Sequence, residues 1–212
     1  MKLWRQYRGF AVFIVLMVVF RSALADWNVV PTGSMKPTIL EGDRILVNKL
    51  AYDLHVPLTH LSIHRFGDPQ RGDIVVFDSK LADTRLVKRV IGLPGDTVSM
   101  RDNRLTINGV AARYSRIVRG AEAVFAIESY PGLSHRIELT PNGGSGLSTF
   151  GPVVVPKDHY LVLGDNRDNS ADSRVYGFVP RDEIVGNARR TVLSLDYDNH
   201  YIPRADRFFH PL

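Results

Sequence analysis

Residues 85–96 have the sequence Arg-Leu-Val-Lys-Arg-Val-Ile-Gly-Leu-Pro-Gly-Asp. Leu, Val and Ile recur through the first part, and Gly-Leu-Pro-Gly ends it, which is typical of a β-strand that leads into a turn. The same alternation of short apolar runs with Gly, Pro, Asn and Asp continues along the chain after Trp27. The clearest predicted strands are Arg44–Leu50, Asp73–Phe77, Arg85–Ile91, Thr97–Met100, Arg104–Ile107, Tyr160–Leu163 and Thr191–Leu195.

The connections between these runs indicate how the strands are joined. Asp102-Asn103 and Asn108-Gly109 predict tight turns, so Thr97–Ala112 is expected to form a hairpin with a continuation. Leu50–Phe66 fits neither the helical nor the strand period, and we expect a loop with a single helical turn there. The fold class that follows is mainly β, with antiparallel sheets in a barrel-like domain.

The overall composition limits the classes of function that the chain can have. The chain has 212 residues, 44% of them hydrophobic, which is enough for a substantial core. Cysteine is absent, so there is no disulfide framework and no thiolate metal site or nucleophile. The net charge of +5 is compatible with nucleic acid or anionic lipid as a partner. Because no recognition helix, zinc spacing or RNA-binding signature accompanies the charge, we favour lipid, or no specific anionic partner at all, and expect no nucleic-acid partner.

The N-terminal residues differ from the rest of the chain. An uncharged apolar run occupies Gly9–Phe20, which is about 18 Å of helix. Basic residues precede this run at Lys2, Arg5 and Arg8. One interpretation is a cleaved signal peptide, for which Ala23-Leu24-Ala25 supplies an A-x-A site.

The other interpretation is an uncleaved membrane anchor. Trp4 and Trp27 bracket the segment as interfacial aromatic residues do, and roughly 36 Å of helix between them would cross a bilayer. Arg21 is close enough to Trp27 for its side chain to reach the interface. The basic N-terminal residues would then remain in the cytoplasm, and the rest of the chain would face outward. Composition alone leaves both interpretations open.

Residues 30–38 have the sequence Val-Pro-Thr-Gly-Ser-Met-Lys-Pro-Thr, with Ser34 in the middle. Gly33 permits close approach of the backbone, and Pro31 and Pro37 stiffen the loop on either side. The pattern predicts an exposed and fixed serine, which is what a nucleophile requires. A Thr-Gly-Ser sequence by itself is more often only a turn.

Lys88 is the candidate base for such a serine. A lysine can act as a base only if its pKa falls below the free value of ~10.4, and burial among apolar side chains lowers it. Leu86 and Val90 share the strand face of Lys88, whereas Arg85 and Arg89 lie on the opposite face, where we expect them to reach water. The alternative is an edge-strand lysine that guards against aggregation.

A third stretch, Gly164–Arg174, is dense in Asp and Asn. It could be a solvated turn cluster, whereas a calcium loop is disfavoured because the sixth-position Gly and the closing Glu of an EF-hand are missing. The chain has seven histidines, none in a metal-binding spacing, and it has no G-x-S-x-G motif. We therefore expect surface histidines, no His-based triad, and no metal or cofactor.

Taken together, these stretches resemble bacterial type I signal peptidases, the serine–lysine proteases that remove signal peptides from exported proteins. The resemblance runs from the N-terminal segment to about Pro180, and its blocks follow the family's order. The four blocks are Pro31–Thr38, Arg71–Phe77, Arg85–Asp96 and Gly164–Pro180.

The resemblance implies catalytic roles residue by residue. Ser34 corresponds to the family's nucleophile and Lys88 to its general base. The amide N–H of Ser34 and the hydroxyl of Thr32 correspond to its oxyanion hole. Many relatives have serine where Thr32 stands, so the hydroxyl is kept, but the β-branch can alter its aim.

The fourth block implies supporting roles. Ser170 corresponds to the serine that orients the lysine, and Asp172 and Arg174 correspond to an ion pair that supports the site. The middle segment, 102–150, corresponds to the family's smaller and variable β-region, and we assign no function to it.

The implied protein is a membrane-anchored serine endopeptidase that cleaves preproteins after small residues in an Ala-X-Ala pattern. Residues 1–27 would form a cytoplasmic tip and a transmembrane helix, and 28–212 a β-rich catalytic domain on the outer, periplasmic side of the inner membrane. Ser34 follows the apolar run closely, which favours the anchor over the cleaved peptide. Preproteins and membrane lipid would be its partners.

Two other functions fit the same patterns. One is a conjugation- or pilin-type processing peptidase with the same dyad and narrower substrates. The other is an inactive, membrane-tethered β-domain that binds exported chains. Replacement of Ser34 separates an enzyme from a binding domain, because only the enzyme would lose an activity while keeping its fold.

Overall fold

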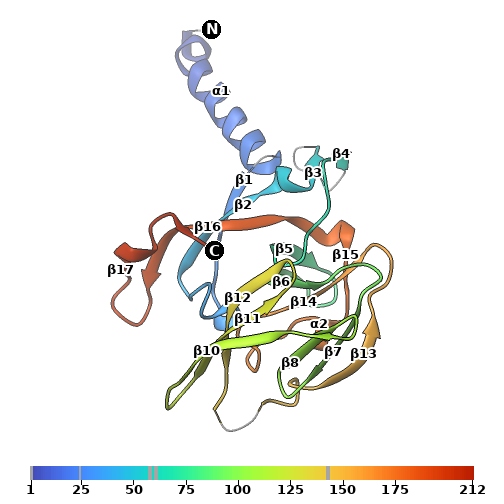
Figure 1. Ribbon diagram of the computed structural model, residues 1–212. Coiled ribbons are helices and arrows are strands. Elements are labelled where there is room, and N and C mark those ends of the chain that lie inside the picture. Colours follow the sequence, from blue (N-terminus) through green and yellow to red (C-terminus); the bar gives the residue numbers. More distant parts are fainter. Residues whose placement is uncertain (1, 24, 57–58, 60–61, 142–143) are drawn as a thin grey trace.

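A computed structural model describes residues 2–23, 25–56, 59, 62–141 and 144–212 of the chain. One helix, α1 (Lys2–Ala23), projects from a body made of β-sheets (Figure 1). The expected mainly β fold is therefore confirmed. All pairings between strands of its named sheets are antiparallel, as the sequence predicted.

The expected transmembrane helix is not supported. Among the described residues, no helix is both long and apolar enough to cross a membrane. The helix α1 has 22 residues, but basic residues lie near both of its ends. Its uncharged run, Gly9–Phe20, provides about 18 Å of helix against the roughly 30 Å of a bilayer core. Large apolar side chains are nevertheless exposed along it: Tyr7, Phe10, Val12, Phe13, Ile14, Leu16, Met17 and Val18.

The central sheet carries the candidate site. Its strand order is β1-β2-β16-β5-β6-β14-β15, with β17 and β18 also paired to β16. The strands are β1 (Ala25–Val29), β2 (Asp43–Asn48), β5 (Ile74–Ser79), β6 (Thr84–Gly92), β14 (His159–Leu163), β15 (Val179–Pro180), β16 (Ile184–Asp196), β17 (Ile202–Pro203) and β18 (His210–Pro211). The C-terminal strand β16 lies between β2 and β5, and β14 pairs with β6, so the sheet brings the N-terminal, middle and C-terminal blocks together.

Two smaller sheets come from the middle of the chain. One has the order β13-β7-β8-β9 and the other the order β10-β11-β12. The strands are β7 (Thr97–Arg101), β8 (Arg104–Ile107), β9 (Val110–Ala111), β10 (Arg113–Arg119), β11 (Val124–Tyr130), β12 (Leu133–Leu139) and β13 (Phe150–Val154). The predicted hairpin is confirmed: Asp102 and Asn103 join β7 to β8 with φ of 47° and 59°, as a type I′ turn requires.

The segment Leu50–Phe66 differs from the sequence prediction. A short 3-10 helix, η2 (Lys49–Ala51), supplies the expected helical turn. It is followed by a hairpin of β3 (Asp53–His55) and β4 (Ser62–Arg65) where we expected a loop. Cross-strand pairing stabilises the hairpin, and single-sequence periodicity does not reveal such pairing in strands this short. Pro57 lies outside the described residues.

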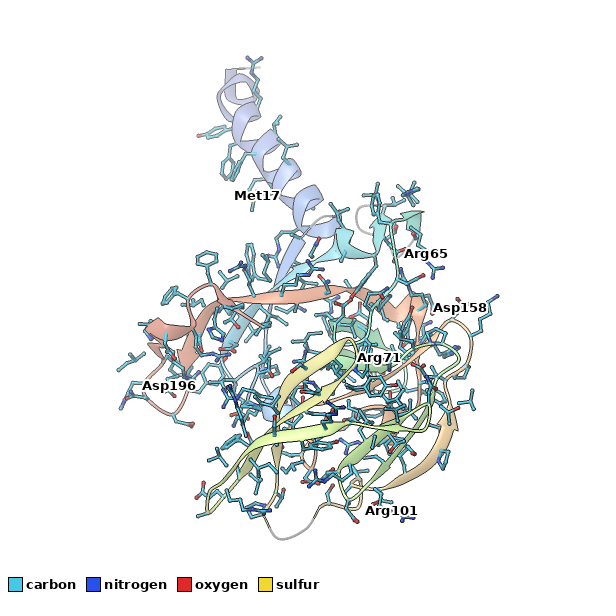
Figure 2. All side chains as sticks on the ribbon, viewed as in Figure 1. Met17, Arg65, Arg71, Arg101, Asp158 and Asp196 are labelled. Atoms are coloured by element: carbon cyan, nitrogen blue, oxygen red, sulfur yellow. The ribbon has the colours of Figure 1, made fainter. Side chains whose placement is uncertain are left out.

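Side chains fill the space between the sheets (Figure 2). One buried cluster joins β6 and β14 to β7 and β8 through Ile91, Val98, Leu105 and Leu163. Polar contacts reinforce this junction: Arg71, labelled in Figure 2, pairs with Asp96 at 2.9 Å and lies over the ring of Tyr130. The smaller sheets are thus packed onto the central sheet through β6 and β14.

Candidate active site

Ser34 lies in η1 (Gly33–Met35), a single 3-10 turn between β1 and β2. The side chain of Met35 is buried in the same cluster as Val30 and Ile39, which anchors the loop on both sides of the serine. The amide of Ile39 also donates to the carbonyl of Met35 at 2.9 Å. Ser34 itself is only partly buried, so a fixed backbone presents an accessible hydroxyl.

Lys88 on β6 meets this hydroxyl. Its Nζ lies 2.6 Å from Ser34 Oγ, although the two residues are 54 positions apart in sequence. The lysine is only 3% exposed, and Val75 is its direct partner on β5. Burial lowers the pKa of Lys88 to about 8, although the carboxylates of Asp172 and Asp165 oppose this shift. A lysine with such a pKa is partly neutral near pH 8 and can accept a proton.

The fourth block, Gly164–Pro180, also holds the serine loop. The amide N–H of Asn166 donates to the carbonyl of Ser34 at 3.1 Å, and its side-chain Nδ2 donates to the carbonyl of Gly33 at 3.2 Å. The hydroxyl of Thr38 donates to Asp165 at 2.5 Å. Backbone and side chain of one short segment therefore fix both ends of the turn that carries Ser34.

Asp172 and Arg174 form an ion pair of 2.7 Å next to this segment. The carboxylate of Asp172 also accepts from the amide of Gly164 at 2.9 Å, and it caps α2 (Ser173–Tyr176). Arg174 reaches further, to the carbonyl of Leu147 at 3.0 Å. The pair thus ties the end of β14 to the part of the middle segment that precedes β13.

Ser170 is close to the serine loop, but its hydroxyl is not bonded to Lys88. Among the described residues, the buried Ser170 Oγ has no hydrogen-bond partner. A Cβ placed on Gly164 would lie 2.2 Å from Ser170 Oγ and 2.4 Å from the carbonyl oxygen of Ser34. Only glycine fits between these two groups, so Gly164 lets the fourth block approach the backbone of the serine loop.

Thr32 precedes η1 in an extended conformation, with φ of −129° and ψ of 153°, and is exposed. Its hydroxyl makes no capping bond to η1. The residue thus stands beside Ser34 at the accessible side of the loop. Its role as an oxyanion donor stays a prediction.

Two expectations about charged residues are wrong. Arg89 was expected to reach water, but it is 6% exposed and pairs with Asp165 at 2.7 Å. Its partner lies 76 positions away, so local alternation could not reveal the pair. His135 was expected at the surface, but it is 7% exposed and lies in a buried cluster with Glu128 and Arg167. Sequence reasoning missed this cluster because the middle segment carries no recognisable motif.

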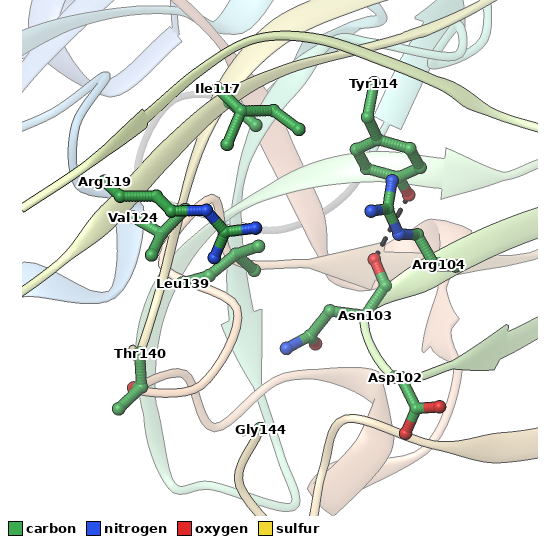
Figure 3. A pocket seen from close by; sticks show the side chains of 11 residues that line it. Asp102, Asn103, Arg104, Tyr114, Ile117, Arg119, Val124, Leu139, Thr140 and Gly144 are labelled. Atoms are coloured by element: carbon green, nitrogen blue, oxygen red, sulfur yellow. Dashed lines mark hydrogen bonds between the residues drawn. The ribbon is translucent and has the colours of Figure 1, made fainter. Parts of the chain in front are cut away.

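A cavity of about 360 Å³ lies in the middle segment, and Figure 3 shows its lining. The hydroxyl oxygen of Tyr114 lies 3.2 Å from the backbone oxygen of Asn103 there. Arg104 stacks over the ring of Tyr114. None of the lining residues is a predicted site residue.

Known proteins of similar sequence indicate the family to which this chain belongs. A family model described as signal peptidase, peptidase S26, matches residues 3–193. Signal peptidase I of Pseudomonas fluorescens is 36% identical over 197 residues, covering 85% of this chain and 69% of the relative. Signal peptidase I P of Bacillus subtilis subsp. natto is 35% identical over 193 residues, covering 90% of each chain.

A solved structure of a signal peptidase I from Enterococcus faecalis also matches. It is 36% identical, covers 57% of this chain and 97% of that one, and superposes with a TM-score of 0.38. The protein is therefore a peptidase, as the family model and the relatives establish. It belongs to the signal peptidase family, S26.

Proposed function

We propose that this peptidase cleaves signal peptides from exported preproteins, with Ser34 as nucleophile and Lys88 as general base. The observation that carries the proposal is the contact of 2.6 Å between Lys88 Nζ and Ser34 Oγ, made by a lysine whose pKa burial lowers to about 8. The names of the relatives supply the substrate class, signal peptides.

The proposed reaction has two stages. Ser34 Oγ attacks the carbonyl carbon before the scissile bond, and its proton passes to Lys88 Nζ. The C–N bond then breaks, and the same proton moves to the leaving amine. Water then attacks the ester: Lys88 accepts a proton from the water and returns it to Ser34 Oγ as the ester bond breaks. The amide N–H of Ser34 and the hydroxyl of Thr32 would stabilise the oxyanion in both stages.

The positions of Ser34 and Lys88 would be supported by Ser170, Asp172 and Arg174. The ion pair of Asp172 and Arg174 holds the end of β14 against the serine loop through the amide of Gly164. Ser170 would orient the neutral amine after a rotation of its unpaired hydroxyl. We expect its replacement by alanine to weaken cleavage and to leave the pH dependence in place.

The substrate would bind as an added strand. β6 pairs with β5 over Thr84–Arg89, whereas β14 pairs with it only from Arg89 onward. Thr84–Lys88 therefore has one free edge within the described sheet, and this edge ends at the catalytic lysine. An extended chain with small residues near the cut would pair there, which is the β-augmentation mode of peptide recognition.

Membrane attachment through α1 is a further part of the proposal. Its exposed apolar side chains and the basic residues near its ends suit contact with lipid, which would keep the site near the signal peptides it cleaves. Flotation with anionic lipid vesicles tests this attachment. Phe10→Asp with Phe13→Asp should reduce flotation, whereas Leu81→Asp, at an exposed apolar position outside α1, should not.

Cleavage of a purified preprotein in detergent tests the catalytic assignment. Ser34→Ala and Lys88→Met should each abolish cleavage and keep the fold. Ser115→Ala and Lys80→Met change an exposed serine and an exposed lysine, and they should cleave normally. Near-normal turnover of either dyad variant would exclude the dyad. A wild-type protein that binds the preprotein and never cuts it would indicate a binding domain instead.

A further inference from the structure

We propose that the three-stranded sheet β10-β11-β12 positions the nucleophile, and that Glu128 and His135 are its positioning residues. This inference rests on the proposed function, because it assigns these residues to the placement of Ser34. Neither residue is close in sequence to the four blocks of the family resemblance. Both belong to the middle segment, to which the sequence assigned no function.

The first link is a buried ion pair between this sheet and the fourth block. Arg167 and Glu128 are both 0% exposed. Nη1 of Arg167 donates to one carboxylate oxygen of Glu128 at 2.8 Å, and Nη2 donates to the other at 2.5 Å. Burial alone would raise the pKa of Glu128, but Arg167 holds it below its usual range. Removal of either charge would leave the other buried and uncompensated, which is strongly unfavourable.

The second link is His135, which stands between two ion pairs. Its Nε2 lies 3.4 Å from Nη2 of Arg167, 3.7 Å from Glu128 and 3.5 Å from Asp165. Asp165 is in turn paired with Arg89. Burial lowers the pKa of His135 to about 4, so the ring is neutral at neutral pH even though two carboxylates and two guanidinium groups face it. A neutral ring fills this space without adding charge.

The third link is made by the backbone. The amide of Glu138, at the end of β12, donates to the carbonyl of Asp165 at 2.9 Å. The amide of Arg167 donates back to the carbonyl of Glu138 at 3.0 Å. Asn166 lies between these two bonds, and it is the residue that bonds both Ser34 and Gly33. Asn166 therefore couples the position of β12 to the position of Ser34.

A separate anchor supports the same segment. Nδ2 of Asn103 lies 2.9 and 3.1 Å from the two carboxylate oxygens of Asp168. The hydroxyl of Tyr114 donates to Glu128 at 2.5 Å. The middle segment therefore holds residues 165–168 through side-chain bonds to Arg167 and Asp168 and through the backbone bonds of β12. We infer that loosening it would misplace Ser34 while the substrate edge of β6 stays intact.

Glu128→Gln and His135→Gln test this inference in the full-length protein. Glu122→Gln and Arg136→Gln are matched controls, because they change exposed residues of the same region. We expect kcat to fall on the order of tenfold or more in the two test variants, since small misplacements of reacting groups are costly. KM should stay within about twofold, because the substrate edge is not altered.

Amide hydrogen exchange supplies the second readout. Exchange should quicken in the peptides that cover 33–38 and 164–168, while β5 and β16 stay protected as in the wild type. Unchanged kcat in folded test variants would overturn the inference. Uniformly faster exchange with a lower Tm would also overturn it, because the residues would then be merely structural. If the wild type failed to cleave preproteins, the proposed function would fail, whereas the exchange pattern would still decide whether the sheet holds the serine loop.

Discussion

A change of pH alters the protonation of Lys88, and the burial of this lysine determines the pH at which the change occurs. Burial lowers its pKa from an ordinary 10.5 to about 8. A pKa of 8 leaves about one tenth of the lysine neutral at pH 7, about half at pH 8 and nearly all of it at pH 10. A lysine at its ordinary pKa would be neutral in only about 3 molecules in 10⁴ at pH 7. Burial therefore increases the active form at neutral pH by roughly 300-fold.

This difference predicts the shape of the pH profile of kcat/KM. The rate should rise about tenfold from pH 6 to pH 7, about fivefold from pH 7 to pH 8, and about twofold from there to pH 10. The assay is cleavage of a preprotein at low substrate concentration, with far-UV circular dichroism to show that the fold persists. A flat profile would exclude a lysine base. A rise centred near ~6.5 would indicate a histidine, and one near ~10.4 a lysine that burial does not perturb.

Three further predictions follow from the same contacts. Lys88→Met should raise the free energy of unfolding at pH 7 by up to roughly 3 kcal/mol. Burial of the lysine lowers its pKa in the folded state, so the lysine disfavours folding below pH 8 and ceases to do so above pH 10.5. Equal or lower stability in urea unfolding would contradict the burial argument. Thr32→Val should reduce kcat ~10²-fold or more while Thr32→Ser does not, since only the valine removes the oxyanion donor; equal kcat for Val and wild type would remove Thr32 from the oxyanion hole. The folded-state pKa of His135 is about 4 and its ordinary value 6.5, so the fold should lose about 3 kcal/mol as the pH falls from 6.5 to 4. His135→Gln should flatten this part of the stability profile, and an unchanged slope would show that another group carries it.

Local patterns in the sequence were sufficient for the fold class and for the turns. The predicted strand around Lys88 corresponds to β6, and the Asp102-Asn103 turn adopts the positive φ angles that asparagine and aspartate tolerate. These features depend on a few adjacent residues. The contact between Ser34 and Lys88 became predictable only through the family resemblance, because nothing local links residues 54 positions apart.

The errors concern interactions between distant parts of the chain. Alternation along β6 places Arg89 opposite Lys88, and a guanidinium without a known partner is expected to reach water. Its partner Asp165 belongs to another strand connection, so the burial of the pair depends on tertiary structure alone. His135 was misassigned for the same reason, since Glu128, Asp165 and Arg167 surround it only in the folded protein. The expected transmembrane helix is unsupported for a different reason: Trp4 and Trp27 suggested a length that the uncharged part of α1 does not reach.

The central claim is that Ser34 becomes covalently acylated during cleavage. Rapid acid quenching of the protein with a preprotein, followed by digestion and mass spectrometry, would detect this intermediate. The account predicts an ester on Ser34 that carries the signal peptide, absent in Ser34→Ala and in Lys88→Met. An acyl group on any other residue, or cleavage by Ser34→Ala at the wild-type rate, would contradict it.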